Sequence, residues 1–195
     1  MNILVIPEDF RNDQYILKPI VKAMFKHLGK PNAKIIVCQN PLLGGIVQAK
    51  NWQQIEEILH LYEGMVDIYL LLVDRDGEAG RRAVLDNIEA NAKNILSTNR
   101  VLFAENAWQE LEVWALAGCH NLPKEWNWKD IRSERDSKEK YFEPYAKSSG
   151  LLDEPGEGRT TLGREAGANY QRVRKLCPED IVSLEDKLRQ YLGAN

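Results

Sequence analysis

Four short apolar runs alternate with amphipathic helical patterns, and this alternation limits the fold more than any other feature of the sequence. The apolar runs cover residues 2–6, 33–39, 66–74 and 100–105. Apolar residues recur at helical spacing over residues 12–29, 52–62, 79–96 and 106–118. Strands that alternate with helices form right-handed crossovers, so the sequence predicts an α/β fold with a mainly parallel four-stranded sheet flanked by helices.

The last third of the chain has a different character. Residues 124–150 hold two tryptophans and a dense run of mixed charge, which is typical of a solvated helix or a lid. Residues 153–170 are glycine-rich and turn-like, whereas residues 178–192 have the pattern of a closing helix. We therefore expect an α/β core over residues 1–120. A charged insertion and a basic C-terminal extension, residues 121–195, should pack on the same domain.

Composition narrows the class of protein. The formal net charge of −3 argues against a uniformly basic nucleic-acid coat but leaves room for a local basic patch. The cysteines and histidines lack zinc-ligand spacing, and the cysteines suggest no disulfide framework. No window approaches the roughly 18 to 20 apolar residues of a membrane span, and the first apolar run meets Glu8 too early for a signal peptide. We expect a cytoplasmic protein that does not enter a membrane.

Acidic residues stand at the ends of three predicted strands. Glu8 and Asp9 follow the first strand, the sequence Asp74-Arg75-Asp76-Gly77-Glu78 follows the third, and Glu105 follows the fourth. Ligands of open parallel sheets bind beyond the carboxyl ends of the strands, so these acids are expected at one edge of the sheet.

The D-x-D pair is the central candidate for chemistry. Carboxylates at Asp74 and Asp76 can project to the same side and share one cation, whereas without a cation they would repel each other and at least one pKa would rise. Mg²⁺ is a hard ion that prefers oxygen ligands, so it would resolve this conflict. A surface turn explains the charges equally well when the stretch is taken alone. The additional acid after the first strand favours a metal site.

The same residues carry a resemblance to a known family. A strand that ends in Glu8 (ILVIPED) and a later strand that ends in Asp74 and Asp76 (LLLVDRDGE) resemble the TOPRIM fold of topoisomerases, primases and OLD-type nucleases. The segments AENAWQELEVWALAG and RTTLGREAGANYQRVRKLCPEDI are similar to parts of the small stand-alone TOPRIM-like proteins of unknown function that are related to OLD nucleases. The family's glycine after the first-strand glutamate is Asp9 here, so the turn differs and Asp9 can share or replace the role of Glu8.

The resemblance implies Mg²⁺-dependent cleavage of phosphodiester bonds, with Mn²⁺ as a substitute metal. Glu8 would act as acid/base or as a second-metal ligand, and Asp74 and Asp76 would be catalytic residues that hold the metal. Glu78 is a candidate outer ligand, although a role in the first turn of the following helix explains it equally well.

A third catalytic acid is implied on the acid-aromatic segment. Glu112 is the best match to the family, with Glu105 and Glu110 as rivals. The family also implies a nucleic-acid substrate, an AAA-type or ABC-type ATPase partner, and a role in phage defence.

Basic residues supply candidate phosphate contacts. Arginine forks match phosphate oxygens, and cations near an acidic metal site would position a nucleic-acid backbone. The candidates are Arg75, Arg81, Arg159, Arg164, Arg172, Arg174 and Lys175. A solvated loop and helix face is the alternative for the late stretch. Arginines in the first turn of the helix at residues 79–96 oppose the helix dipole, which favours a functional role.

Two other functions remain open at this stage. One is a non-catalytic, metal- or partner-binding α/β regulatory module of the receiver type, and the other is a degenerate TOPRIM scaffold. The doubled D-x-D and the basic tail favour the nuclease. The sequence does not specify whether the substrate is DNA or RNA, or whether it is single- or double-stranded. It also does not specify whether the protein is active without a partner, or its oligomeric state.

Overall fold

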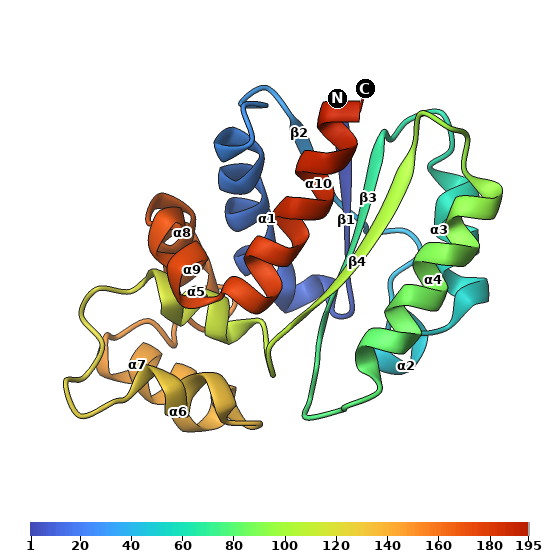
Figure 1. Ribbon diagram of the computed structural model, residues 1–195. Coiled ribbons are helices and arrows are strands. Elements are labelled where there is room, and N and C mark those ends of the chain that lie inside the picture. Colours follow the sequence, from blue (N-terminus) through green and yellow to red (C-terminus); the bar gives the residue numbers. More distant parts are fainter. Residues whose placement is uncertain (195) are drawn as a thin grey trace.

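A computed structural model describes residues 1–194, which form a central sheet with helices on both faces (Figure 1). All strands pair in parallel, and their order is β2-β1-β3-β4. This arrangement confirms the predicted four-stranded parallel sheet flanked by helices. The strands are β1 (Asn2–Pro7), β2 (Lys34–Val37), β3 (Ile68–Asp74) and β4 (Val101–Ala107).

The helices form two layers. Figure 1 shows α1 and α10 on one side of the sheet and α3 and α4 on the other. The first layer and its neighbours comprise α1 (Phe10–His27), α5 (Glu112–Gly118), α6 (Trp128–Ser133), α7 (Glu143–Ser148), α8 (Arg159–Ala168), α9 (Tyr170–Leu176) and α10 (Ser183–Ala194). The second comprises α2 (Ile46–Ala49), α3 (Trp52–Leu61) and α4 (Arg81–Ile95). Two π-helical turns, Lys138–Phe142 and Pro178–Val182, precede α7 and α10.

The direction in which the chain crosses the sheet explains the layers. The first crossover, through α1, leads from β1 to β2 on one side, whereas the later ones lead through α3 and α4 to β3 and β4 on the other side. Right-handed crossovers in opposite directions place their helices on opposite faces. Side chains of β3 therefore enter two apolar clusters, Leu70 in one and Leu71 in the other. Burial on both faces accounts for its continuous apolar sequence.

The helix predicted at 106–118 is wrong in its first half. β4 extends to Ala107, which pairs with Asp74, so Glu105 lies inside the strand. A tight turn follows, in which Gln109 has a φ of +79° and its carbonyl accepts the N–H of Arg75 at 2.7 Å. Helix α5 begins only at Glu112. Strand pairing and turn hydrogen bonds therefore override the apolar spacing of this stretch.

The turn-like region predicted at 153–170 is also partly wrong, because α8 occupies most of it. Its glycines serve close packing against α1. A Cβ atom on Gly163 would lie 2.2 Å from the carbonyl oxygen of Tyr15, and one on Gly167 would lie 2.9 Å from that of Pro19. The glycines therefore bring two helix backbones together and do not interrupt the helix.

A buried polar network fastens the C-terminal part to the sheet. Asp180 accepts hydrogen bonds from the indole N–H of Trp114 at 2.7 Å and from the backbone N–H of Trp108 at 2.8 Å. It also pairs with Arg132 at 3.1 Å. One residue thus connects the end of β4, α5 and α6. Within residues 1–194, no helix is both long and apolar enough to cross a membrane.

Candidate functional site

The candidate site lies where the strand order reverses. β1 stands between β2 and β3, so the crossovers run in opposite directions from this point, and the carboxyl ends of β1 and β3 are the usual ligand position in such sheets. Glu8 follows β1 and Asp74 ends β3. The backbone N–H of Asp74 donates to Oε2 of Glu8 at 3.4 Å, so the structure brings these two predicted residues together across 66 positions of sequence.

Asp9 caps the helix that follows, and this role engages both of its carboxylate oxygens. Its carboxylate accepts the backbone N–H of Arg11 at 2.9 Å and the side-chain amide of Asn12 at 2.9 Å, which makes it the N-cap of α1. The carbonyl of Glu8 accepts the N–H of Gly45 at 3.0 Å. The loop after β2 is thus hydrogen-bonded to the turn that follows β1.

The carboxyl groups of Glu8 and Asp74 at this edge have raised pKa values. Burial raises the pKa of Glu8 to about 7, although the N–H of Asp74 opposes the shift, and the charge of Asp76 adds to it. Burial also raises the pKa of Asp74 well above its usual range, and the charges of Glu112 and Glu8 reinforce the effect. Acids that share a desolvated crevice retain protons unless a cation compensates for them.

Asp13 belongs to this cluster, although it is not among the site residues predicted from the sequence. Burial raises its pKa to about 8, with further contributions from Glu112 and Glu8, and its Oδ2 accepts the backbone N–H of Asp9 at 3.0 Å. The signal was its place in the first turn of the helix after the first strand. That turn starts at the same edge of the sheet as Glu8.

Among the three candidate acids on the acid-aromatic segment, Glu112 reaches the cluster. Its charge contributes to the raised pKa values of Glu8, Asp13 and Asp74. Glu110 instead accepts from the hydroxyl of Ser137 and the N–H of Lys138. Glu105 pairs with Arg82 and Lys187 beside α4 and α10.

Glu112 forms an ion pair with an arginine that lies 47 residues later in the sequence. The guanidinium of Arg159, the first residue of α8, donates from Nε to Glu112 at 3.0 Å, and only 2% of Arg159 is exposed. This buried ion pair occupies an arginine that was predicted to contact nucleic acid. Arg159 therefore lies inside the protein next to the site and does not contribute to its surface.

Asp76 is held by a second buried arginine. Nη2 of Arg81 lies 3.2 Å from Oδ2 of Asp76 and 4.0 Å from the exposed carboxylate of Glu78. Arg81 is only 2% exposed, and its Nε and Nη1 atoms have no hydrogen-bond partner. Buried N–H groups without an acceptor are costly, so this guanidinium has capacity for a further anionic group.

The donor chemistry suits a hard cation, although the side chains are not arranged as a cage. Glu8, Asp74 and Asp76 offer carboxylate oxygens, the ligand type that Mg²⁺ prefers. Among residues 1–194, however, no group of three or more histidine, cysteine, aspartate or glutamate side chains is placed to hold a metal ion. The pairing of Asp76 with Arg81 accounts for part of this, because it engages one expected ligand elsewhere.

Of the remaining residues predicted to contact phosphate, some interact with other groups of the protein and others are exposed. The guanidinium of Arg75 lies over the ring of Trp108, 4.0 Å from its centroid. Arg174 pairs with Glu185 at 2.8 Å, and Arg172 donates to the carbonyl of Cys119 at 3.2 Å. Arg164 and Lys175 are exposed.

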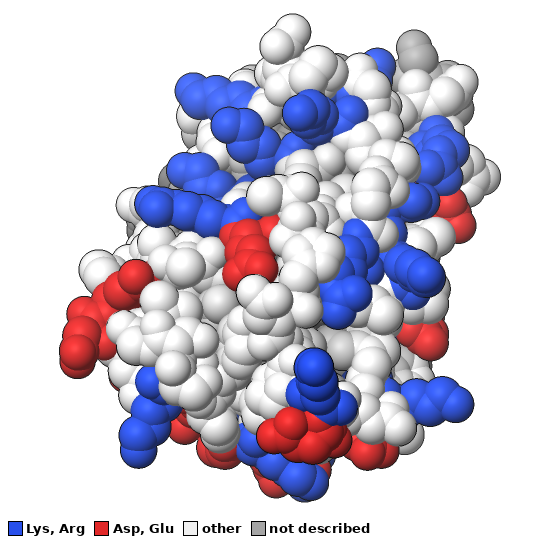
Figure 2. Space-filling model, turned by 90° about the vertical axis from the view of Figure 1, so that its left-hand side faces the viewer, with Lys and Arg blue, Asp and Glu red and all other residues white. Residues whose placement is uncertain are grey.

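A row of lysines on α1 is a basic feature that the sequence analysis missed. Lys18, Lys22 and Lys26 are exposed and four residues apart, so they line one side of the helix. Because α8 packs against α1, Arg164 belongs to the same part of the surface. Figure 2 shows Lys and Arg side chains gathered over the upper part of this face. The four-residue spacing opposite the apolar stripe was the available signal.

Comparisons with protein-family models, with curated proteins and with solved structures found no match to this chain. The resemblance to TOPRIM proteins therefore stays a prediction.

Proposed function

We propose that the protein is a metal-dependent nuclease that cleaves phosphodiester bonds at the carboxyl ends of β1 and β3. The observation that carries this proposal is the gathering of Glu8, Asp74 and Asp76 next to a buried Arg81 with two unpartnered nitrogens. Carboxylates that a cation would relieve, beside a guanidinium that lacks an anion, form a site for a metal-bound phosphate. The TOPRIM resemblance supports the same chemistry.

Mg²⁺, or Mn²⁺ in its place, is the proposed cofactor. Glu8, Asp74 and Asp76 would hold it, and Glu78 is the candidate outer ligand. A bound divalent ion of this kind polarises a phosphoryl oxygen and increases the acidity of a bound water.

The chain's own residues supply the proton transfer and the positioning. Glu8, with a pKa of about 7, is suited to accept a proton from an attacking water near neutral pH. The free nitrogens of Arg81 would bind a non-bridging phosphate oxygen. Glu112 acts as a positioning residue in this proposal, because its pair with Arg159 fixes the end of α5 beside the acids.

A nucleic-acid substrate is supported by the basic face of α1 and α8. The α1 helix begins at the site, with Asp13 in its first turns, and the lysine row continues away from the site along the helix. Successive lysines are about 6 Å apart along the axis. Such a row can neutralise several phosphates of one strand without reading its sequence.

The direct test is a cleavage assay with plasmid DNA, single-stranded DNA and RNA in Mg²⁺, Mn²⁺ or EDTA. We expect the wild type to cleave at least one substrate with metal, and Asp74→Asn and Glu8→Gln to lose about two or more orders of magnitude in rate. Asp153→Asn, an exposed aspartate outside the site, is the matched control and should retain full activity. Cleavage that persists in Asp74→Asn would refute the site. Absence of cleavage on all substrates, alone and with cell extract, would refute the activity.

A non-catalytic metal- or partner-binding module is the second candidate. The ion pairs Arg81–Asp76 and Arg159–Glu112 favour it, because they already neutralise two of the acids. In that case the wild type would bind Mg²⁺ or a partner at this edge without cleavage. An ATPase partner of the AAA or ABC type, a cytoplasmic location and a role in phage defence remain implications of the resemblance.

A further inference from the structure

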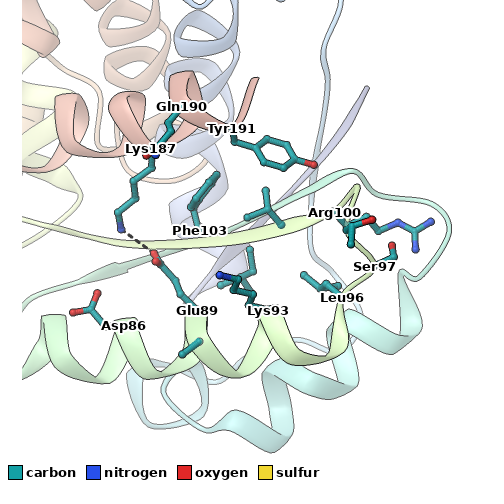
Figure 3. A pocket seen from close by; sticks show the side chains of 14 residues that line it. Asp86, Glu89, Lys93, Leu96, Ser97, Arg100, Phe103, Lys187, Gln190 and Tyr191 are labelled. Carbon is teal, nitrogen blue, oxygen red and sulfur yellow. Dashed lines mark hydrogen bonds and ion pairs between the residues drawn. The ribbon is translucent and has the colours of Figure 1, made fainter. Parts of the chain in front are cut away.

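A trough runs along the free edge of the sheet, away from the acidic site. β4 is the last strand, and α4 and α10 stand on either side of it. The cavity between them has a volume of about 740 Å³, and Figure 3 shows the side chains that line it. Its apolar lining includes Leu96, Val101, Leu102, Phe103 and Tyr191.

Along this trough, the outward backbone groups of β4 have partners at Ala104 but not at Leu102, a residue that is 3% exposed. The N–H of Val101 donates to Asp67 on the inner side, so alternate residues, Leu102 and Ala104, direct their N–H and C=O groups outward. The N–H of Ala104 donates to Glu89 at 2.7 Å, and its carbonyl accepts from Arg82 at 2.9 Å and Lys187 at 3.2 Å. Within residues 1–194, no strand or side chain bonds to the outward groups of Leu102.

The two walls suit alternating side chains. Leu102 packs with the cluster under α4, whereas Phe103 packs with the cluster under α10, 6.2 Å from the ring of Tyr191. In an added strand, successive side chains would likewise enter the α4 side and the α10 side in turn. The trough therefore has apolar walls on both sides of a backbone position that lacks partners.

The two ends of the trough differ in charge. At the Ala104 end, Lys187 pairs with Glu89 at 2.8 Å (dashed in Figure 3), and this pair closes the trough. Toward the amino end of β4, Lys93 and Arg100 line the cavity, and neither forms an ion pair among the described residues. The open end is therefore cationic and complements a carboxylate.

We propose that this trough binds an extended peptide segment of another protein, paired antiparallel to β4, with its terminal carboxylate beside Lys93 and Arg100. A strand whose carboxyl end lies at the amino end of β4 runs antiparallel to it, and Leu102 would then exchange both its hydrogen bonds with one peptide residue. Helices on both sides would hinder the edge of a second copy, which carries its own helices, but they leave room for a single extended chain. The proposal is independent of the nuclease activity.

The probe is a pool of fluorescein-labelled six-residue peptides with Val, Ile, Leu, Phe or Tyr at alternate positions, Ser or Thr between them, and a free carboxyl terminus. Anisotropy should show saturable binding to the full chain. The same pool with an amidated terminus should bind about tenfold more weakly, and so should the free-acid pool to Lys93→Glu/Arg100→Glu. Lys124→Glu/Lys147→Glu makes the same charge change at exposed lysines elsewhere and should bind as the wild type does.

Hydrogen exchange reports the predicted pairing directly. In the free protein, the amide of Leu102 should exchange faster than that of Phe103, which faces β3, and bound peptide should slow Leu102 by about tenfold or more. Three results would overturn the proposal: no binding by the free-acid pool, equal binding by the amidated pool, or binding without protection of Leu102. Concentration-dependent dimers that protect Leu102 without peptide would assign the trough to a second copy instead.

Discussion

Buried carboxyl groups determine the behaviour of the site at the level of single residues. Glu8, Asp13 and Asp74 come from β1, α1 and β3, and burial raises the pKa of each. The charge of Arg81 opposes the raised pKa of Glu8, and Arg159 lies beside Glu112, but each guanidinium is already paired with another acid. Near neutral pH, these carboxyl groups of the folded protein thus still bind protons that the unfolded chain has already released.

Asp13 offers a direct test of this proton retention. Its pKa is about 8 in the folded protein, against 3.8 for the unperturbed group, so the folded state binds more protons than the unfolded state between these values. Stability is therefore lost as the pH rises from about 4 to 8. Asp13→Asn should remove the part of this loss that comes from Asp13. The free energy of unfolding of the variant, relative to the wild type, should therefore grow across this range to a few kcal/mol at pH 8, on the order of 1.4 kcal/mol per pKa unit.

The measurement is urea denaturation in EDTA at several pH values. Asp153→Asn, an exposed aspartate, serves as the control and should show no such growing advantage. If the stability difference between Asp13→Asn and the wild type stays constant from pH 4 to pH 8, the carboxyl group of Asp13 is ionised normally and the account of the cluster fails.

The buried pair between Glu112 and Arg159 gives a second residue-level prediction. Removal of one partner leaves an uncompensated buried charge, so Arg159→Met should destabilise the protein by about 3 to 5 kcal/mol. The double variant Arg159→Met/Glu112→Leu should recover a large part of this loss, because it leaves no charge without a partner. A double-mutant cycle by chemical denaturation measures the coupling. Additive losses would show that the pair does not act as a unit.

At the level of elements, the sequence correctly predicted the helices and strands whose hydrophobic periodicity is set by burial. β1, β3, α1, α3 and α4 agree with their predicted ranges to within about two residues, because each buries a regular stripe or both faces. The errors fall where local pattern competes with tertiary contacts. Residues 106–111 have helical spacing but pair with β3 and form a turn, and α8 has turn-like glycines that pack against α1.

The packing of α8 makes a prediction about its glycines. Gly163→Ala would place a Cβ atom 2.2 Å from the Tyr15 carbonyl oxygen, so α8 would have to move away from α1. We expect a loss of about 2 kcal/mol or more, as for other overpacked cores. Gly193→Ala is the matched control in α10, where a Cβ atom would have nothing within 4 Å, and it should be neutral or slightly stabilising. A stable Gly163→Ala variant would contradict the close helix contact.

At the scale of the whole molecule, the edge of the sheet could be predicted but its neutralising partners could not. Strand ends at Glu8 and Asp74 follow from the alternation of elements, and a parallel sheet necessarily brings them to one edge. Arg159 reaches Glu112 from 47 residues away, through a helix that the sequence did not predict. No spacing rule encodes such a contact, because it depends on how α8 lies between α1 and α5.

The acids of the proposed metal site come together only in the folded molecule, and this leads to a prediction about linkage. A divalent ion that binds only the folded state stabilises it by about 2.7 kcal/mol at one hundred times its dissociation constant. The ligands must be deprotonated to bind, and burial raises the pKa of Glu8 to about 7 and that of Asp74 well above its usual range. The rise in melting temperature with Mg²⁺ should therefore be larger at pH 8 than at pH 5 and should be accompanied by proton release.

Thermal denaturation measures the effect when a buffer with Mg²⁺ is compared with an EDTA buffer brought to the same ionic strength with KCl. Calorimetry in buffers of different ionisation enthalpy measures the released protons. Asp74→Asn should abolish both, whereas Asp153→Asn should retain both. A rise that is equal at pH 5 and pH 8, or that survives in Asp74→Asn, would place the ion elsewhere on the protein. Because neither measurement requires turnover, the result separates a site that binds metal from one that also cleaves. It therefore distinguishes the regulatory module from an inert scaffold even if no nucleic acid is cut.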